Sequence, residues 1–196
     1  MPRTKKAFLK IRHQSKRKII NASLKLFAVN GYHSTSIRQI AEAANISNGL
    51  LYNYFDGKEA LLHEILNDAT KKIMESFDPN NDVILTKEEF LYFIDQTICN
   101  IQINTSYWRL YSSLMLQPKI IDIVLYNFEK HNNSMNKMLL VFFQKQGSKN
   151  PKGEVFLFQT ILKGAMIQFV SMPNKYPINY LKETLINHYK KSPFWT

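Results

Sequence analysis

The stretch whose side chains suggest chemistry is 47–54, in which small, amide and phenol groups follow one another. Asn48 can pair with a base edge, and Tyr52 can pack on a thymine methyl group or hydrogen-bond a phosphate. Asn53 and Tyr54 are donors that suit phosphate oxygens. These residue types favour contact with nucleic acid. Ordinary packing of the two tyrosines in a small helical domain is the alternative.

Two short helical patterns joined by a tight turn position this stretch. Ser36 can cap the first helix, and Gln39 three residues later completes a capping box. Asn45 then occupies a turn position where a left-handed backbone is tolerated. Ser47 caps the second helix, which is expected to continue to about Tyr54.

The second helix is expected to present different sides to the core and to the outside. Leu51 and Phe55 are spaced i and i+4, so they supply a core face without the two tyrosines. Tyr52 and Tyr54 therefore point elsewhere, which weakens the packing interpretation. Small residues such as Gly49 at the start of the helix let its N-terminus approach phosphates and bases closely.

Apolar residues recur at three- and four-residue spacing nearly throughout the chain, so the predicted fold class is all-α. A first helix around Ile19–Phe27 ends at Gly31, which suits a left-handed cap. A fourth helix begins at Asp56 with Glu59 and runs to about Phe77. The turn-like stretch 78–82 follows, and further helices are expected at about 86–104, 106–116, 118–146, 154–171 and 179–190.

The stretch SIRQIAEAANISNGLLYNYFDGKEALL resembles the DNA-binding signature of the TetR family of transcriptional regulators. The resemblance covers roughly residues 16–69. It implies an N-terminal three-helix helix-turn-helix domain in residues 1–56. It also implies a larger helical ligand-binding and dimerisation domain, with the linking helix, in residues 57–196.

The resemblance also implies the DNA-contacting residues, although the sequence departs from the family pattern at three of the positions considered. Asn45 stands where the family often has Gly, Leu50 where many members have Thr, and Asn48 where Lys is common. The changes at Leu50 and Asn48 bear on which operator sequence is recognised rather than on whether DNA is bound. Lys58, a cation in the first turn of a helix, opposes the helix dipole, which makes sense if it faces DNA. The implied set is Ser36, Arg38, Asn48, Gly49, Leu50, Tyr52, Asn53, Tyr54 and Lys58.

Charge is uneven along the chain, whose formal net charge is +11. Residues 1–72 hold thirteen Lys or Arg against five Asp or Glu. A basic N-terminal third suggests a polyanionic partner, either nucleic acid or an anionic membrane. A basic N-terminal arm is expected to bind DNA without regard to its sequence; its cations are Arg3, Lys5, Lys6, Lys10, Arg12, Lys16, Arg17 and Lys18.

Aromatic side chains beyond residue 82 suggest either a core or an apolar ligand cavity. Trp108, Tyr111 and Met115 are spaced i, i+3 and i+7 on one helical face, and Phe128 and Phe169 add aromatic surface on other helices. These five are the candidate ligand-binding residues. The candidate polar anchors are Tyr111, Arg109, Gln168 and His131.

The helices at 154–171 and 179–190 are expected to form a homodimer. The first is apolar on more sides than one core can use, and a palindromic half-site arrangement needs two helix-turn-helix domains. The predicted function is a repressor that an unidentified, largely apolar small molecule releases from a palindromic operator in double-stranded DNA. Activation is the alternative within the family. The alternative outside it is an apolar-ligand carrier or interaction protein with a basic, membrane-binding surface.

Other functional classes lack their signatures. The five histidines are scattered and Cys99 is the sole cysteine, so neither a zinc site nor an intramolecular disulfide is expected. No phosphate loop or nucleophile elbow occurs, and neither an enzyme nor a cofactor is predicted. No apolar run is long enough to span a bilayer and no signal peptide is recognised, so a cytoplasmic protein is expected.

Overall fold

The computed structural model describes residues 5–80, 82–117 and 120–191, with side chains from Leu9 onward except at 121 and 123–132. The described residues form helices and no strand, which confirms the predicted all-α class. The helices are α1 (Lys5–Asn30), α2 (Ile37–Ala43), α3 (Asn48–Tyr52), α4 (Lys58–Phe77), α5 (Lys87–Ile103), α6 (Thr105–Met115), α7 (Ile121–Lys145), α8 (Pro151–Ser171) and α9 (Ile178–Lys191).

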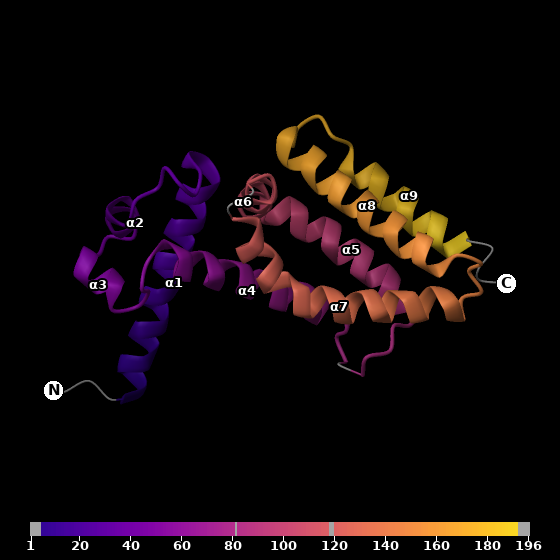
Figure 1. The fold of residues 1–196 in the computed structure, drawn as a ribbon, viewed down its shortest axis with the longest axis horizontal. Coiled ribbons are helices and arrows are strands. Elements are labelled where there is room, and N and C mark those ends of the chain that lie inside the picture. Colours follow the sequence, from indigo (N-terminus) through magenta and orange to yellow (C-terminus); the bar gives the residue numbers. More distant parts are fainter. Residues whose placement is uncertain (1–4, 81, 118–119, 192–196) are drawn as a thin grey trace.

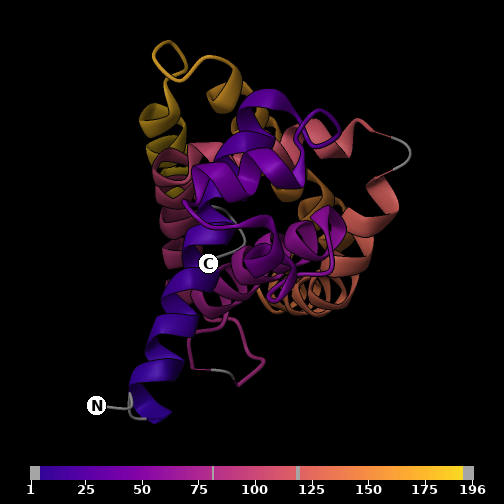
Figure 2. The same cartoon turned by 90° about the vertical axis from the view of Figure 1, so that its left-hand side faces the viewer.

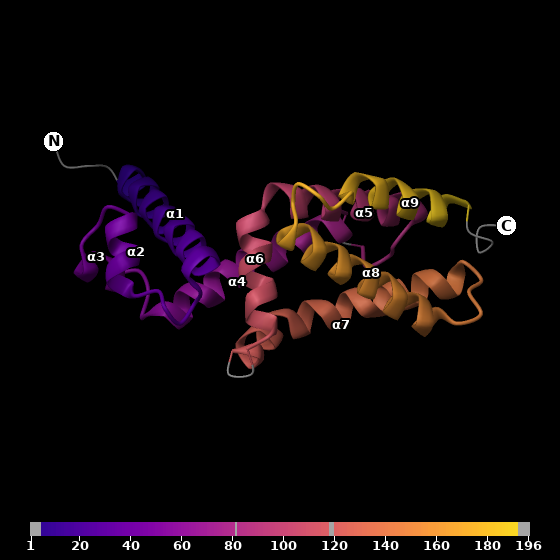
Figure 3. The same ribbon diagram turned by 90° about the horizontal axis from the view of Figure 1, so that it is seen from above.

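Helices α1, α2 and α3 gather at one end of the molecule and are called the N-terminal domain below (Figure 1). Its centre is made of side chains that are fully or almost fully buried, among them Ile19, Phe27, Ile40 and Leu51. Helix α4 leaves this domain and runs into the second group of helices, α5 to α9, as Figure 3 shows from above. Helix α3 lies at the outer tip, so one of its sides is exposed.

The two groups of helices share a continuous core. Helix α1 packs on α6, and Ile65 of α4 belongs to the same buried cluster as Ile98 of α5 and Trp108 of α6. A second buried cluster lies further along the molecule. In it, the ring centroid of Phe90 lies 4.6 Å from that of Phe142 and 5.0 Å from that of Tyr189. Helices α4 and α6 are therefore packed directly against the N-terminal domain.

Most helix boundaries follow the sequence signals. Gly31 has φ +85°, as expected for a left-handed cap, and Thr86 with Glu89 forms a capping box before α5. Helix α8 begins earlier than expected, because the Asn150 side chain accepts a hydrogen bond from the backbone of Gly153. The expectation that Asp56 begins α4 is wrong: Gly57 is the N-cap and makes no side-chain hydrogen bond.

The basic N-terminal segment is helical from Lys5 on and continuous with the rest of α1. The first helix is therefore much longer than the apolar pattern from Ile19 to Phe27 indicated. Among the described residues, no helix is long and apolar enough to cross a membrane.

Candidate nucleic-acid interface and ligand cavity

The turn between α2 and α3 has the geometry that its sequence predicts. Ser36 accepts a hydrogen bond from the backbone of Gln39 while the Gln39 side chain accepts one from the backbone of Ser36, which completes the capping box. Asn45 has φ +55° in the turn, and Ser47 caps α3 by accepting from the backbone of Leu50. These local bonds define where α2 and α3 begin.

Helix α3 has one buried side and one open side. Leu51 is fully buried and anchors the helix, while Asn48 and Gly49 are exposed and Tyr52 is 54% exposed. No other part of the described chain comes within 4 Å of the place that a Cβ on Gly49 would occupy. Internal packing therefore does not require a glycine there, whereas close approach by an external partner would.

The remaining candidate contact residues surround α3. Ser36, Arg38 and Asn53 are exposed, and Leu50 is 38% exposed. Tyr54 is half-buried, and its ring lies 5.2 Å from the guanidinium carbon of Arg12 on α1. Sequence reasoning placed Arg12 in a separate arm, and no local signal links it to a residue 42 positions away. A cation held against Tyr54 extends the basic surface beside α3.

Lys58 has an internal role that the sequence did not indicate. Its Nζ donates to the backbone oxygens of Tyr32 and His33, both at 3.0 Å, and lies 5.0 Å from the centre of the Tyr32 ring. The ammonium group thus ties the start of α4 to the loop that precedes α2. It has three N–H donors. With two of them directed at carbonyls, one remains for a phosphate.

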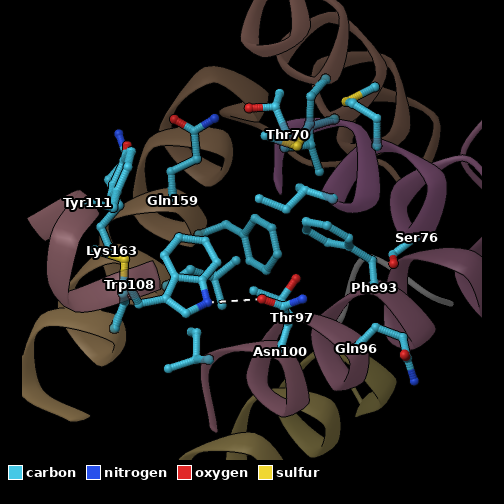
Figure 4. Close-up of a pocket in the computed structure, with 18 of the residues that line it drawn as sticks. Thr70, Ser76, Phe93, Gln96, Thr97, Asn100, Trp108, Tyr111, Gln159 and Lys163 are labelled. Atoms are coloured by element: carbon cyan, nitrogen blue, oxygen red, sulfur yellow. Dashed lines mark hydrogen bonds between the residues drawn. The ribbon is translucent and has the colours of Figure 1, made fainter. Parts of the chain in front are cut away.

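A cavity of about 250 Å³ lies between α4, α5, α6, α7 and α8 (Figure 4). Its lining is mostly apolar and holds no Asp or Glu among the described residues. The lining residues are Thr70, Ile73, Met74, Ser76, Phe93, Gln96, Thr97, Asn100, Ile101, Trp108, Tyr111, Met135, Asn136, Leu139, Phe158, Gln159, Leu162, Lys163 and Met166.

Two pairs of polar side chains in the cavity lining are hydrogen-bonded to each other. Trp108 Nε1 donates to Asn100 Oδ1 at 2.9 Å, and Gln159 donates to Asn136. Burial raises the pKa of the Tyr111 phenol, so it stays neutral near pH 7. The cavity therefore offers apolar surface with a few oriented amide, hydroxyl and indole groups, and Lys163 as its charged lining residue.

The candidate ligand-binding residues divide between the cavity and the core. Trp108 and Tyr111 line the cavity, whereas Met115 and Phe169 do not and pack in the core cluster. Met115 follows Trp108 by seven residues, about 10 Å along the helix, and so lies beyond the cavity. Phe169 likewise follows Met166, which is the last cavity residue of α8.

Other predicted anchors lie elsewhere. Arg109 and Gln168 are exposed and do not line the cavity. The side chains of Phe128 and His131 fall outside those that the structure describes. The sequence did not indicate the cavity amides, which come from three helices: Gln96 and Asn100 of α5, spaced i and i+4, Asn136 of α7 and Gln159 of α8.

The outer side of α8 carries exposed apolar side chains. Phe156 is 74% exposed, Leu157 49% and Ile167 50%, and Tyr180 of α9 is 72% exposed. Their spacing places the three α8 residues on one side of the helix, away from buried Phe158 and Ala165. This apolar surface, on the two helices expected to dimerise, is called the α8–α9 face below.

Comparisons with known proteins agree with this geometry. The family described as "Bacterial regulatory proteins, tetR family" matches residues 19–65. The HTH-type transcriptional regulator YuxN of Bacillus subtilis is 55% identical over 49 residues, which are 25% of this chain and 17% of that protein. The chain spans about a sixth to a third of the length of the first curated relatives it matches. Sequence similarity to them thus covers between a quarter and about a third of this chain.

Solved structures match almost the whole fold. The fatty acid degradation regulator FadR from Bacillus halodurans has a TM-score of 0.77 at 16% identity, over 91% of this chain and 96% of that one. FadR from Bacillus subtilis, solved in complex with stearoyl-CoA, has a TM-score of 0.74 at 18% identity, over 88% and 96%. The family match covers the latter part of α1, the capped α2–α3 unit and the start of α4, and it leads to one conclusion: residues 19–65 form a domain of the TetR family of transcriptional regulators.

Proposed function

We propose that this protein binds double-stranded DNA as a homodimeric transcriptional repressor. The observation that carries the proposal is the open side of α3. Asn48, Gly49 and Tyr52 are exposed there, while Leu51 on the opposite side is fully buried. Small and polar groups at the start of a recognition helix are what entry into the major groove requires. The repressor role is an inference from the family and not from these contacts.

The α8–α9 face supports the homodimer. Apolar side chains as exposed as Phe156 and Tyr180 gain free energy when a second copy covers them. A two-fold axis through such a face presents two copies of α3 to DNA. These must lie about 34–36 Å apart to enter successive major grooves on one side of the duplex. Dimerisation thus sets the palindromic form of the operator.

The ligand is a largely apolar small molecule that is neutral or anionic. Apolar walls favour a hydrocarbon portion, and the amides of Asn100 and Gln159 can orient a polar group. The lining holds Lys163 and no described carboxylate, which disfavours a cation. The likeness to FadR from Bacillus subtilis, solved with stearoyl-CoA, supports acyl compounds as the first class to test.

The core that the two groups of helices share explains how a ligand in the cavity would release the protein from DNA. The cavity touches α4 through Thr70 and Ile73 and touches α6 through Trp108, and both helices pack against the N-terminal domain. A ligand that favours one tilt of α4 changes the distance between the two copies of α3. Its effect on DNA affinity is limited to its differential affinity for the two arrangements, typically about 1–3 kcal/mol.

Selection from a random pool of duplex DNA tests the DNA-binding part of the proposal. The full chain should enrich a palindrome whose half-sites are about one helical turn apart. Vesicles of phosphatidylcholine and phosphatidylglycerol serve as the competing polyanion. Binding to the vesicles together with no enriched DNA sequence would contradict the proposal and favour a membrane-binding carrier.

A further inference from the structure

The first half of α1 is a strongly cationic helix that the N-terminal domain does not need for its core. The buried stripe of α1 consists of Ile19, Ser23 and Phe27, and no described side chain before Ile19 is buried. The sequence holds ten Lys or Arg and no Asp or Glu before Glu42. Folding alone gives no reason to concentrate like charges on a helix, since neighbouring cations repel each other.

Two of these cations, Lys16 and Arg12, connect α1 to α4 and to the residues that follow α3. Lys16 Nζ donates to Glu64 Oε1 of α4 at 2.7 Å and lies 5.6 Å from the centre of the Phe55 ring. One turn earlier, the Arg12 guanidinium lies 5.2 Å from the ring of Tyr54. Arg12, Lys16 and Ile19 are spaced i, i+4 and i+7, so the side of α1 that packs on the domain continues into its basic half.

Beyond Arg12 the helix projects away from the other helices. Figure 2 looks at the molecule from the α3 side and shows the N-terminal part of α1 running clear of the remaining helices. Leu9, Lys10 and Ile11 are exposed there, and Lys5 and Lys6 lie in the first helical turns. The projection spans eight residues from Lys5 to Arg12, which is about 12 Å of helix.

We propose that residues 5–18 form a rigid helical extension that lies along the DNA backbone beside each half-site. This inference rests on the proposed DNA-binding function and deepens it. The charge of the extension suits phosphates, and a preformed helix avoids the entropy cost of ordering a flexible arm on binding. A projection of about 12 Å reaches past the half-site by roughly three base pairs at 3.4 Å per pair.

The decisive comparison is Ile11→Pro against Ile11→Ala. Both variants remove the same exposed side chain and keep every charge, but proline breaks the helix at that point. Ile11→Pro should bind the selected operator and random duplex about tenfold more weakly than Ile11→Ala. The slope of the logarithm of its binding constant against the logarithm of salt concentration should be smaller in magnitude by about 2. Each lost phosphate contact contributes about 0.9 to that slope. Both variants should unfold at the same temperature.

Hydroxyl-radical footprinting adds a positional readout. The Ile11→Ala footprint should extend beyond each half-site, and the Ile11→Pro footprint should lose that flank. Equal affinity, salt slope and footprint for the two variants would overturn the rigid extension and favour a flexible arm. So would a loss by Ile11→Pro of binding to phosphatidylglycerol vesicles with DNA binding unchanged. If Ile11→Ala and the native protein both fail to bind DNA, the proposed function itself is wrong.

Discussion

The indole Nε1 of Trp108 and the side-chain oxygen of Asn100 form a hydrogen bond of 2.9 Å that joins α6 to α5 at the cavity wall. Both residues line the cavity, and Asn100 also lies at the groove between α1, α4 and α6. This pair therefore stands between the proposed ligand and the N-terminal domain.

Trp108→Ala should leave operator affinity of the ligand-free protein within about twofold but reduce the ligand response at least about fivefold. The matched control is Phe169→Ala, which removes another buried aromatic side chain outside the cavity. Both variants should lose stability, on the order of 3–5 kcal/mol. Fluorescence anisotropy of labelled operator with and without an acyl ligand measures the response, and an equal response in the two variants would contradict the cavity assignment.

Tyr52→Ala should weaken binding to the selected operator by about 1–3 kcal/mol and leave binding to random duplex nearly unchanged. The reason is that Tyr52 lies on the open side of α3, where it reads sequence in our account. Its exposure also means that thermal unfolding should be unaffected. A similar loss on both DNAs would show that Tyr52 contacts only the backbone.

Lys58→Ala should weaken operator and random duplex similarly and reduce the salt dependence, because one ammonium donor remains for a phosphate. It should also lower the free energy of unfolding by about 1–3 kcal/mol, since two charged hydrogen bonds to Tyr32 and His33 are lost. Lys71→Ala is the control, because Lys71 is an exposed lysine on the same helix. Unchanged DNA binding in a destabilised Lys58→Ala would leave Lys58 with a structural role alone.

Phe156→Glu and Ile167→Glu should each convert the proposed homodimer to monomers by placing a charge in the α8–α9 face. Val141→Glu is the control, because Val141 is exposed on α7 outside that face. Sedimentation velocity at micromolar concentration distinguishes the species. A native protein that sediments as a monomer would remove the basis of the dimer model.

Tyr189 should make the fold sensitive to alkali. Burial, followed by the negative charge of Glu154, raises the pKa of its phenol to about 12. The phenol of the unfolded chain ionises near pH 10, and that ionisation favours the unfolded state. The contribution of Tyr189 to the free energy of unfolding is therefore complete below about pH 10 and is lost as the pH rises to about 12. Urea unfolding should show that native protein loses roughly 2 kcal/mol over that interval and that Tyr189→Phe loses less.

Tyr180→Phe is the control for this pH dependence, since Tyr180 is exposed and its removal should leave the alkaline loss unchanged. The Tyr189 hydroxyl has no hydrogen-bond partner among the described residues. At pH 7, Tyr189→Phe should therefore change stability by less than about 1 kcal/mol. Identical alkaline curves for native protein and Tyr189→Phe would assign the titration to another group.

Local signals made the helices and their caps predictable. The Ser36–Gln39 box and the left-handed Asn45 depend on neighbouring residues, and both follow the sequence expectation. Contacts between distant segments were not predictable in the same way. Arg12 on Tyr54, Lys58 on the Tyr32 carbonyl and the cavity amide of Asn100 depend on how helices pack, and residue spacing does not encode that arrangement.

The most direct test of ligand-controlled DNA binding is an anisotropy titration of the selected operator in the presence of fatty acids and acyl-CoA compounds of stepped chain length. Isothermal titration first identifies those that bind native protein but not Trp108→Ala. Our account predicts that such a compound lowers operator affinity about 5–150-fold and leaves one dimer per operator at saturation. A compound that binds in the cavity by this criterion and leaves operator affinity unchanged would contradict the account.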